Sequence, residues 1–289
     1  MARALLITSS EGCCIASKDS GGLSIFKNGP EGGARRMNMK KIAVGLGLVL
    51  VAATAAFATP STQIWIPSTD IQPYKKLHFG FDTYMKARKI DGTTREANTI
   101  NNGLTIGVLP FEKVQMEVGI DQRTYGVEPA DSAPFYFNAK LGVPEDALFA
   151  NSPAIAIGGF DFGTKKFDST TGFGTDYNIT YRVIAKTLGK AGRFSVGYYQ
   201  GSEKLLLDKN GQKDNSGVLA SWDRTISEIS DKLWVAVDYM GGENSYGALS
   251  YGAAWKFAPN VGVIFGMEKY NNDNFKPTYT IQVDIDLDL

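Results

Sequence analysis

Three aspartates alternate with apolar residues at the carboxyl end of the sequence, in the stretch TYTIQVDIDLDL that spans residues 278–289. Carboxylates are hard oxygen ligands, so a calcium site is the first chemistry to test. Successive same-face residues of a strand are about 7 Å apart, too far for Asp284, Asp286 and Asp288 to share one ion. The spacing therefore favours diffuse attraction of cations over a metal site, and no cofactor is expected.

His78 is the single histidine of the chain, so catalysis that requires a histidine as general base has one candidate only. A lone histidine on the polar face of a strand is more often a hydrogen-bonding group than a catalyst. The formal net charge is zero, which gives no global attraction to nucleic acid. The sequence therefore predicts neither an enzyme nor a nucleic-acid-binding protein, and no catalytic residue is assigned.

The elements that would position these residues alternate in polarity with a period of two, and no helical period of convincing length is present. Tyr177, Ile179, Tyr181 and Val183, for example, alternate with polar residues. The alternation predicts strands at 75–86, 99–109, 113–123, 134–143, 153–162, 174–187, 193–201, 216–226, 232–241, 246–257, 261–270 and 276–289.

Residues 1–58 are predicted to lie outside the folded domain. Lys40 and Lys41 precede the apolar run 42–57, which ends in a small-x-small pattern at Ala58. This pattern is typical of a secretory signal peptide, so residues 39–58 are predicted to direct Sec-type export with cleavage near Ala58. Residues 1–38, which contain both cysteines, are predicted to be an extension upstream of the true start. Residues 59–74 are predicted to form a periplasmic lead or a plug.

The connections between the predicted strands alternate in length. Those such as 110–112 and 258–260 are short, whereas those such as 202–215 are longer and polar. This asymmetry, with an even number of antiparallel strands, is typical of a transmembrane barrel. The fold class predicted is all-β, a closed antiparallel up-and-down transmembrane barrel of about 12 strands over residues 75–289. Short turns would face the periplasm and longer loops the exterior.

Aromatic residues on the apolar faces fall into two predicted belts, with aliphatic residues between them, as expected at two lipid interfaces. The outer belt comprises Phe135, Tyr177, Tyr198, Tyr239 and Tyr279, and the inner belt comprises Phe79, Phe194, Trp222, Trp255 and Phe257.

The polar faces would line a hydrated interior with charged walls of opposite sign. The predicted acidic wall consists of Asp82, Glu268, Asp284, Asp286 and Asp288, and the predicted basic wall of Lys140, Arg182, Lys186 and Arg193. Opposed walls orient polar solutes, and the surplus of carboxylates predicts a mild preference for cations. The alternative is that these charges pair with one another and fill the interior.

The pattern from residue 75 to the end of the chain resembles that of bacterial outer-membrane β-barrel proteins, many of which end in a strand with alternating apolar residues that assists assembly. Leu289 stands where the family usually has Phe or Trp. The resemblance implies outer-membrane localisation, contact with outer-membrane lipid and recognition by the barrel-assembly machinery.

The predicted function is a narrow, porin-like channel for small polar solutes or ions. Two alternatives are a non-conducting structural or surface-binding barrel and a secreted soluble β-sandwich binding module. The pattern does not fix the oligomeric state.

Overall fold

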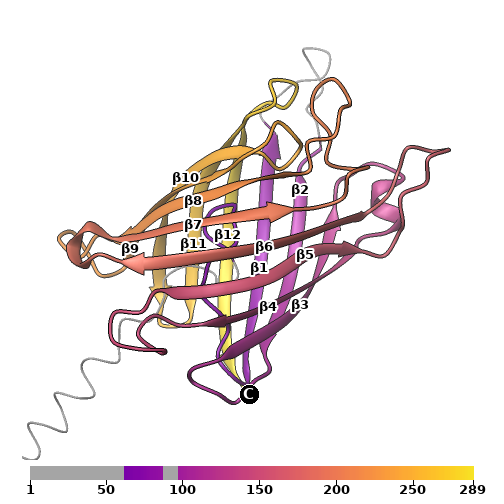
Figure 1. Ribbon diagram of the computed structural model, residues 1–289. Helices are drawn as coiled ribbons and strands as arrows, with labels where there is room; N and C mark the ends of the chain where they lie inside the picture. Colours follow the sequence, from indigo (N-terminus) through magenta and orange to yellow (C-terminus); the bar gives the residue numbers. More distant parts are fainter. Residues whose placement is uncertain (1–61, 87–96) are drawn as a thin grey trace, which may run out of the picture. The chain divides into compact units, whose positions relative to one another are not determined.

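The period-two alternation produces strands that pair with their sequence neighbours and close on themselves. The computed structural model describes residues 62–86 and 97–289, and every strand within them is antiparallel to both of its neighbours (Figure 1). The strands are β1 (Lys76–Lys86), β2 (Thr99–Gly107), β3 (Gln115–Thr124), β4 (Phe135–Val143), β5 (Ala154–Gly163), β6 (Asp176–Thr187), β7 (Arg193–Gln200), β8 (Ser216–Thr225), β9 (Leu233–Met240), β10 (Ala248–Ala258), β11 (Val261–Tyr270) and β12 (Thr278–Asp288).

The first and last strands close the barrel. β1 pairs with β12 along its whole length, from Lys76 opposite Asp288 to Lys86 opposite Thr278. The sheet therefore has no unpaired edge among the described residues, as the predicted fold requires. The prediction of a closed twelve-stranded antiparallel barrel is confirmed, and the alternative of a two-sheet sandwich is wrong.

Several predicted features fall on residues that the structure does not describe. The extension 1–38, the signal peptide 39–58 with its cleavage site near Ala58, and residues 59–61 of the lead lie outside the described ranges. Short 3-10 turns occur at η1 (Ala130–Ser132) and η2 (Gly189–Ala191). None of the helical segments in 62–86 and 97–289 combines the length and apolar character needed to cross a membrane.

The two ends of the barrel differ in their connections. At one end, called the outer end below, run the connections 125–134, 164–175, 201–215, 241–247 and 271–277. At the opposite, inner end run 108–114, 144–153, 188–192, 226–232 and 259–260, together with Leu289. Figure 1 shows β10 and β11 joined by a tight turn at the inner end, whereas β7 and β8 are joined by an extended loop.

Alternate residues of each strand face opposite sides of the sheet. On β12 the side chains of Thr280 and Gln282 are buried inside, whereas Tyr279 on the other face is 47% exposed. The exterior positions carry nine of the ten aromatic residues assigned to the belts, and the tenth is treated below. These nine are Phe79, Phe135, Phe194, Tyr198, Trp222, Tyr239, Trp255, Phe257 and Tyr279.

Strand β6 faces the opposite way from the prediction. Ile179, Tyr181 and Val183 point inward and are buried, while Arg182 lies on the exterior beside Tyr198. Tyr177, predicted for the outer belt, likewise points inward, and its ring packs against Tyr246 at 5.4 Å. The prediction placed every apolar face toward lipid. On this side the barrel encloses apolar partners, so the apolar face of β6 is the inner one.

The partners of the inward face of β6 come from outside the strand pattern. Ile66, which precedes β1, and Leu206, in the loop 201–215, are both fully buried in the cluster that includes Ile179 and Val183. A register shift accompanies this packing where β5 pairs with β6, near Phe160 and Phe162. Asp161, between them, adopts a positive φ of 58°. Such bulges re-aim side chains relative to simple alternation.

One outer loop is fixed by a buried tyrosine. The hydroxyl of Tyr199 on β7 donates to the carbonyl oxygen of Gly241 at 2.7 Å and accepts from the side-chain amide of Asn244 at 2.8 Å. Asn244 in turn accepts from the backbone N–H of Tyr246 at 2.8 Å. This chain of hydrogen bonds holds the loop 241–247 over the barrel interior and places the ring of Tyr246 there.

Replacing Tyr199 with Phe is expected to lower the free energy of unfolding by about 1–2 kcal/mol, because a buried carbonyl and a buried amide lose their partner. The measurement is the midpoint of urea unfolding in detergent micelles. Tyr239→Phe, which removes a hydroxyl from the exterior face, is the matched control and should leave the midpoint unchanged. Equal effects of the two substitutions would contradict the assigned role of Tyr199.

Candidate functional site

Residues 62–74 run through the barrel interior before β1 begins. The chain makes a tight turn in which Thr62 bridges Pro67 and the N–H of Gln63 donates to the carbonyl of Ile66 at 2.7 Å. Ile64 and Ile66 are buried on opposite sides of this turn. Ile64 packs into the cluster formed by β9, β10 and β11, and Ile66 packs into the cluster on β5 to β9. We call residues 62–74 the interior segment.

Carboxylates of the wall hold the backbone of the interior segment. Asp238 accepts from the N–H groups of Ile64 and Trp65 at 2.8 and 3.0 Å. Lower in the barrel, Glu117 accepts from the N–H of Gln72 at 2.6 Å. Pro67 and Pro73 have no N–H, and the other N–H groups of the segment need acceptors once they are buried. These wall carboxylates therefore accept hydrogen bonds from backbone N–H groups of an irregular segment that is not part of the sheet.

Two residues of the predicted basic wall point inward, and both are engaged in ion pairs. Arg193 contacts the carboxylate of Asp70 at 2.6 and 2.8 Å and that of Asp223 at 2.9 Å. Lys140 lies 3.3 Å from Glu117 and also donates to the carbonyl of Asp70. Their charge is thus compensated by the interior segment and by neighbouring strands.

The other two residues of the predicted basic wall are not in the interior, and this part of the prediction is wrong. Arg182 faces outward, as described above. Lys186 lies on the same outer face of β6, opposite Phe194, and its ammonium contacts Glu145 at 3.2 Å and Asp146 at 3.4 Å. Both errors have the same cause, because the reversed facing of β6 moves every charged residue of that strand to the exterior.

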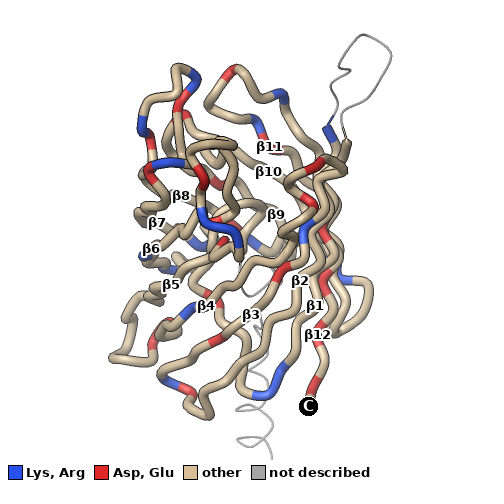
Figure 2. The backbone as a smooth tube through the Cα atoms, turned by 90° about the vertical axis from the view of Figure 1, so that its right-hand side faces the viewer, with Lys and Arg blue, Asp and Glu red and all other residues tan. Residues whose placement is uncertain are grey.

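Four residues of the predicted acidic wall are interior and one is not. Asp82, Glu268, Asp284 and Asp286 lie inside the barrel on β1, β11 and β12. Asp288 continues their face beyond the inner rim, where its side chain is 82% exposed and contacts Lys76 at 3.1 Å. Figure 2 shows that acidic residues recur along the neighbouring strands β12 and β1.

His78 lies between two of these carboxylates near the inner end. Its Nδ1 is 3.0 Å from Asp286 and its Nε2 is 3.4 Å from Asp284. The side-chain amide of Gln72 donates to Asp286 at 3.1 Å, so the interior segment reaches the same cluster. A small cavity of about 40 Å³ lies near the inner end of the barrel, and His78, Lys256, Asp284 and Asp286 are among the residues that line it.

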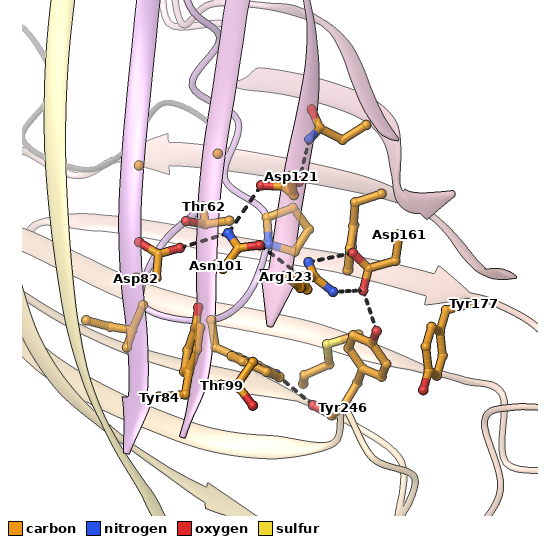
Figure 3. A pocket seen from close by; sticks show the side chains of 18 of the residues that line it. Thr62, Asp82, Tyr84, Thr99, Asn101, Asp121, Arg123, Asp161, Tyr177 and Tyr246 are labelled. Atoms are coloured by element: carbon orange, nitrogen blue, oxygen red, sulfur yellow. Dashed lines mark hydrogen bonds and ion pairs between the residues drawn. The ribbon is translucent and has the colours of Figure 1, made fainter. Parts of the chain in front are cut away.

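A larger cavity of about 350 Å³ lies between the interior segment and strands β1 to β6. Its polar lining is a continuous hydrogen-bond network (Figure 3). The amide nitrogen of Asn101 lies 3.2 Å from both Asp82 and Asp121, and Asn138 donates to Asp121 at 2.8 Å. Arg123 donates to the amide oxygen of Asn101 at 3.0 Å. His78 lines this cavity as well as the small one, so it stands between the two.

Arg123 is held in place by a bidentate ion pair. Its guanidinium nitrogens lie 2.6 and 2.7 Å from the two carboxylate oxygens of Asp161, and the hydroxyl of Tyr246 donates to the same carboxylate. The guanidinium also lies over the ring of Tyr136, 4.7 Å from its centroid. Paired planar groups of this kind are geometrically specific, so the position of Arg123 is well defined.

The sequence prediction missed Arg123 and Tyr246, and it named Trp65 only as an anchor of the possible plug. Arg123 could have been found, because it continues the alternating polar face that includes Glu117 and Asp121. Trp65 and Tyr246 lie in irregular segments, where no periodicity gives the direction of a side chain. In the described part of the chain, no group of three or more His, Cys, Asp or Glu side chains is arranged to hold a metal ion.

No family model and no curated protein matches the sequence. Among solved structures, the KdgM porin is similar with 8% identity and a TM-score of 0.46, covering 73% of this chain and 98% of its own. An outer-membrane channel from Pseudomonas putida F1 has 10% identity and a TM-score of 0.41, covering 73% and 94%. A mutant porin of Rhodopseudomonas blastica has 14% identity and a TM-score of 0.36, covering 65% and 55%.

Similarities at this level do not indicate a solute, a partner or a cellular location for this chain. The barrel fold rests on the strand pairing described above.

Proposed function

We propose that this protein is an outer-membrane β-barrel that forms a narrow channel for small polar solutes or ions, with a mild preference for cations. The observation that carries the proposal is a cavity of about 350 Å³, with carboxylate and amide groups on one wall, inside a closed sheet whose outer face is apolar and aromatic. A soluble barrel has no physical reason to expose such a face.

The exterior suits a bilayer. Exposed exterior side chains at mid-strand include Val196 and Phe265, which are 57% and 53% exposed, and aromatic residues flank them toward both ends. In water such a surface would be costly, whereas in hydrocarbon it is favourable and the paired backbone needs no further partner. This arrangement supports a position in the outer membrane, with lipid as a partner. The alternating apolar residues of β12 support recognition by the barrel-assembly machinery.

The preference for cations follows from which interior charges are compensated. Lys140, Arg123 and Arg193 each lie in ion pairs with carboxylates. Asp82 and Asp121, on the cavity wall, form no ion pair among the described residues and are held by amides instead. A cation that enters the cavity therefore meets two carboxylates whose direct partners are neutral amides.

The proposal is tested by the reversal potential of the purified protein in planar bilayers under a tenfold KCl gradient. We expect conductance with a potential of the sign that denotes potassium permeation. Replacing both Asp82 and Asp121 with Asn should reduce that potential by about half or more. Glu203→Gln, in an exposed outer loop, is the control and should leave it unchanged. Anion selectivity of the natural protein would contradict the proposal.

Localisation is tested separately by fractionating the cell envelope. We expect the mature chain in the outer-membrane fraction, with a gel mobility that changes when the sample is boiled. Recovery in the soluble fraction without detergent would refute the membrane proposal.

A second candidate function, a non-conducting structural or surface-binding barrel, is favoured by the interior segment. Its Ile64 and Ile66 are buried in the two apolar clusters of the barrel interior and fill part of it. The two candidates differ in whether the intact chain conducts, which the bilayer recordings above measure directly.

An enzymatic role is not part of the proposal. Both ring nitrogens of His78 face carboxylates, so neither is directed at a nucleophile, and the residue lies near the inner end. This geometry supports a structural role for the single histidine of the described barrel.

A further inference from the structure

The large cavity has two walls of different chemistry. Strands β1 to β4 supply carboxylate and amide groups, chiefly Asp82, Asn101, Asp121 and Asn138. The remaining wall, from β1, β5, β6, β11, three outer loops and the interior segment, is aromatic. Its rings are Trp65, Tyr84, Tyr125, Phe160, Tyr177, Tyr181, Tyr246, Tyr270 and Phe275.

Apart from Tyr125, these rings form one connected group. Trp65 contacts Tyr84 edge-on with centroids 5.5 Å apart, and it contacts Tyr246 at 6.1 Å. Tyr246 is joined in turn to Tyr177 at 5.4 Å and to Phe160 at 6.2 Å. Figure 3 shows the side chains of Tyr84, Tyr177 and Tyr246 arranged along one side of the cavity, with Asp82 and Asp121 on the other.

The two walls meet on β1. Asp82 and Tyr84 are successive inward residues of that strand and are therefore about 7 Å apart along it. The carboxylate of Asp82 has an amide partner but no cation, as shown above. Behind this corner, Glu268 is fully buried and accepts from Thr278, which lines the cavity, while its other oxygen has no hydrogen-bond partner among the described residues. At this corner of the cavity, carboxylate groups and aromatic rings therefore lie side by side.

We propose that the cavity binds a small organic cation of the quaternary ammonium or protonated amine class. Its charged head lies on the cavity side of the group formed by Asp82, Asn101 and Asp121, and its alkyl groups lie against the rings of Trp65 and Tyr84. This inference deepens the proposed channel, on which it rests for the route by which the ligand enters. The guanidinium of Arg123 is an organic cation held in the same way, because it pairs with the carboxylate of Asp161 and lies over the ring of Tyr136.

An organic cation fits this site better than a metal ion does. A calcium ion needs six or more oxygen ligands at short distance, whereas this wall supplies Asp82 and Asp121, and a third carboxylate, Glu117, already pairs with Lys140. A weakly hydrated organic cation instead gains from ring faces within about 6 Å and from carboxylates that need not coordinate it directly. The volume of about 350 Å³ lies at the small end of the range for ligand pockets, which suits a ligand of about a dozen non-hydrogen atoms or fewer.

The test uses the full mature chain in detergent micelles, with binding followed by calorimetry and by tryptophan fluorescence. Choline is compared with 3,3-dimethylbutan-1-ol, which has the same shape but no charge. We expect choline to bind at least about tenfold more tightly than the neutral compound. Asp82→Asn and Asp121→Asn should each weaken choline binding by about tenfold, and Tyr84→Leu should weaken it by about threefold.

Matched controls separate the site from general effects. Glu203→Gln removes a carboxylate from an outer loop, and Tyr239→Leu removes a ring from the exterior face; each should change choline affinity by less than about twofold. Equal affinity for choline and its neutral analogue would overturn the proposal. So would unchanged affinity in Asp82→Asn and Asp121→Asn, or tight binding of a neutral disaccharide in place of choline.

The same preparation distinguishes this proposal from the channel itself. Conductance without choline binding would refute the organic-cation site alone and leave the channel in place. Choline binding without conductance would refute the channel and retain the site.

Discussion

Deletion of residues 62–72 is expected to raise the single-channel conductance at least about threefold. The interior segment spans the barrel, with Ile66 packed on the side of β5 to β9 and Ile64 on the side of β9 to β11. Its removal joins the cavity along β1 to β6 with the space that the segment now fills. Hydrated cross-section limits ion flow, so the larger opening should conduct more. The measurement is single-channel recording in planar bilayers at fixed KCl concentration.

The deletion should also lower stability, because Asp238 loses two N–H donors and Arg193 loses the carboxylate of Asp70. A lower temperature of heat-modifiable unfolding is therefore expected together with the larger conductance. Deletion of Asp168–Gly172, in an outer loop that does not line the cavity, is the control and should change neither quantity. If the chain without residues 62–72 folds but conducts no better than the intact chain, the interior segment does not occlude the channel.

Replacement of Val283 with Arg is expected to destabilise the barrel in the bilayer by about 2–4 kcal/mol, or to block its insertion. Val283 lies at the middle of β12, between Phe81 and Val263, and all three point outward. A guanidinium at that depth would have to stay in hydrocarbon or deform the bilayer around it. The measurement is the free energy of unfolding in lipid vesicles, taken from urea titrations.

The matched control is Leu287→Arg, on the same face of the same strand but near the inner rim. At an interface the cost should be only about 0–1 kcal/mol. A depth-dependent difference between the two substitutions is the signature of hydrocarbon around the middle of the barrel. Equal and small costs at both positions would mean that water surrounds the sheet, and the membrane proposal would fail.

The strand boundaries could be predicted from the sequence because alternation is a local property. The predicted run 261–270 coincides with β11, and the predicted runs 99–109 and 193–201 exceed β2 and β7 by a residue or two at one end. Closure could also be predicted, since unpaired edges are intolerable in hydrocarbon. On β12 the inward carboxylates Asp284 and Asp286 and the outward Val283 follow directly from the period of two.

The facing of β6 could not be predicted, because alternation defines two faces without saying which is interior. That choice was made by assigning the apolar face to lipid. It fails where irregular chain supplies an apolar partner inside, as Ile66 and Leu206 do. One reversed strand then displaced Tyr177, Arg182 and Lys186 together, so half of the predicted basic wall was lost through a single error.

Of the residues that line the cavity, only those on the strands could be predicted from the sequence. Asp82 and Asp121 follow from the strand pattern, whereas the rings of Trp65 and Tyr246 depend on the path of non-repeating chain. Those paths are fixed by individual hydrogen bonds, such as that from the indole N–H of Trp65 to the carbonyl of Tyr246 at 2.8 Å. Such bonds join residues far apart in sequence and leave no local signature.

The seam between β1 and β12 has a consequence for biogenesis. The ribosome makes the interior segment and β1 before the other strands, and β12 after all of them, yet β1 and β12 are neighbours. The barrel therefore cannot close until β12 has been made, and the interior segment must already be in place at that moment. A chain truncated before Thr278 would have two unpaired edge strands, β1 and β11, and should be more susceptible to proteolysis than the complete barrel.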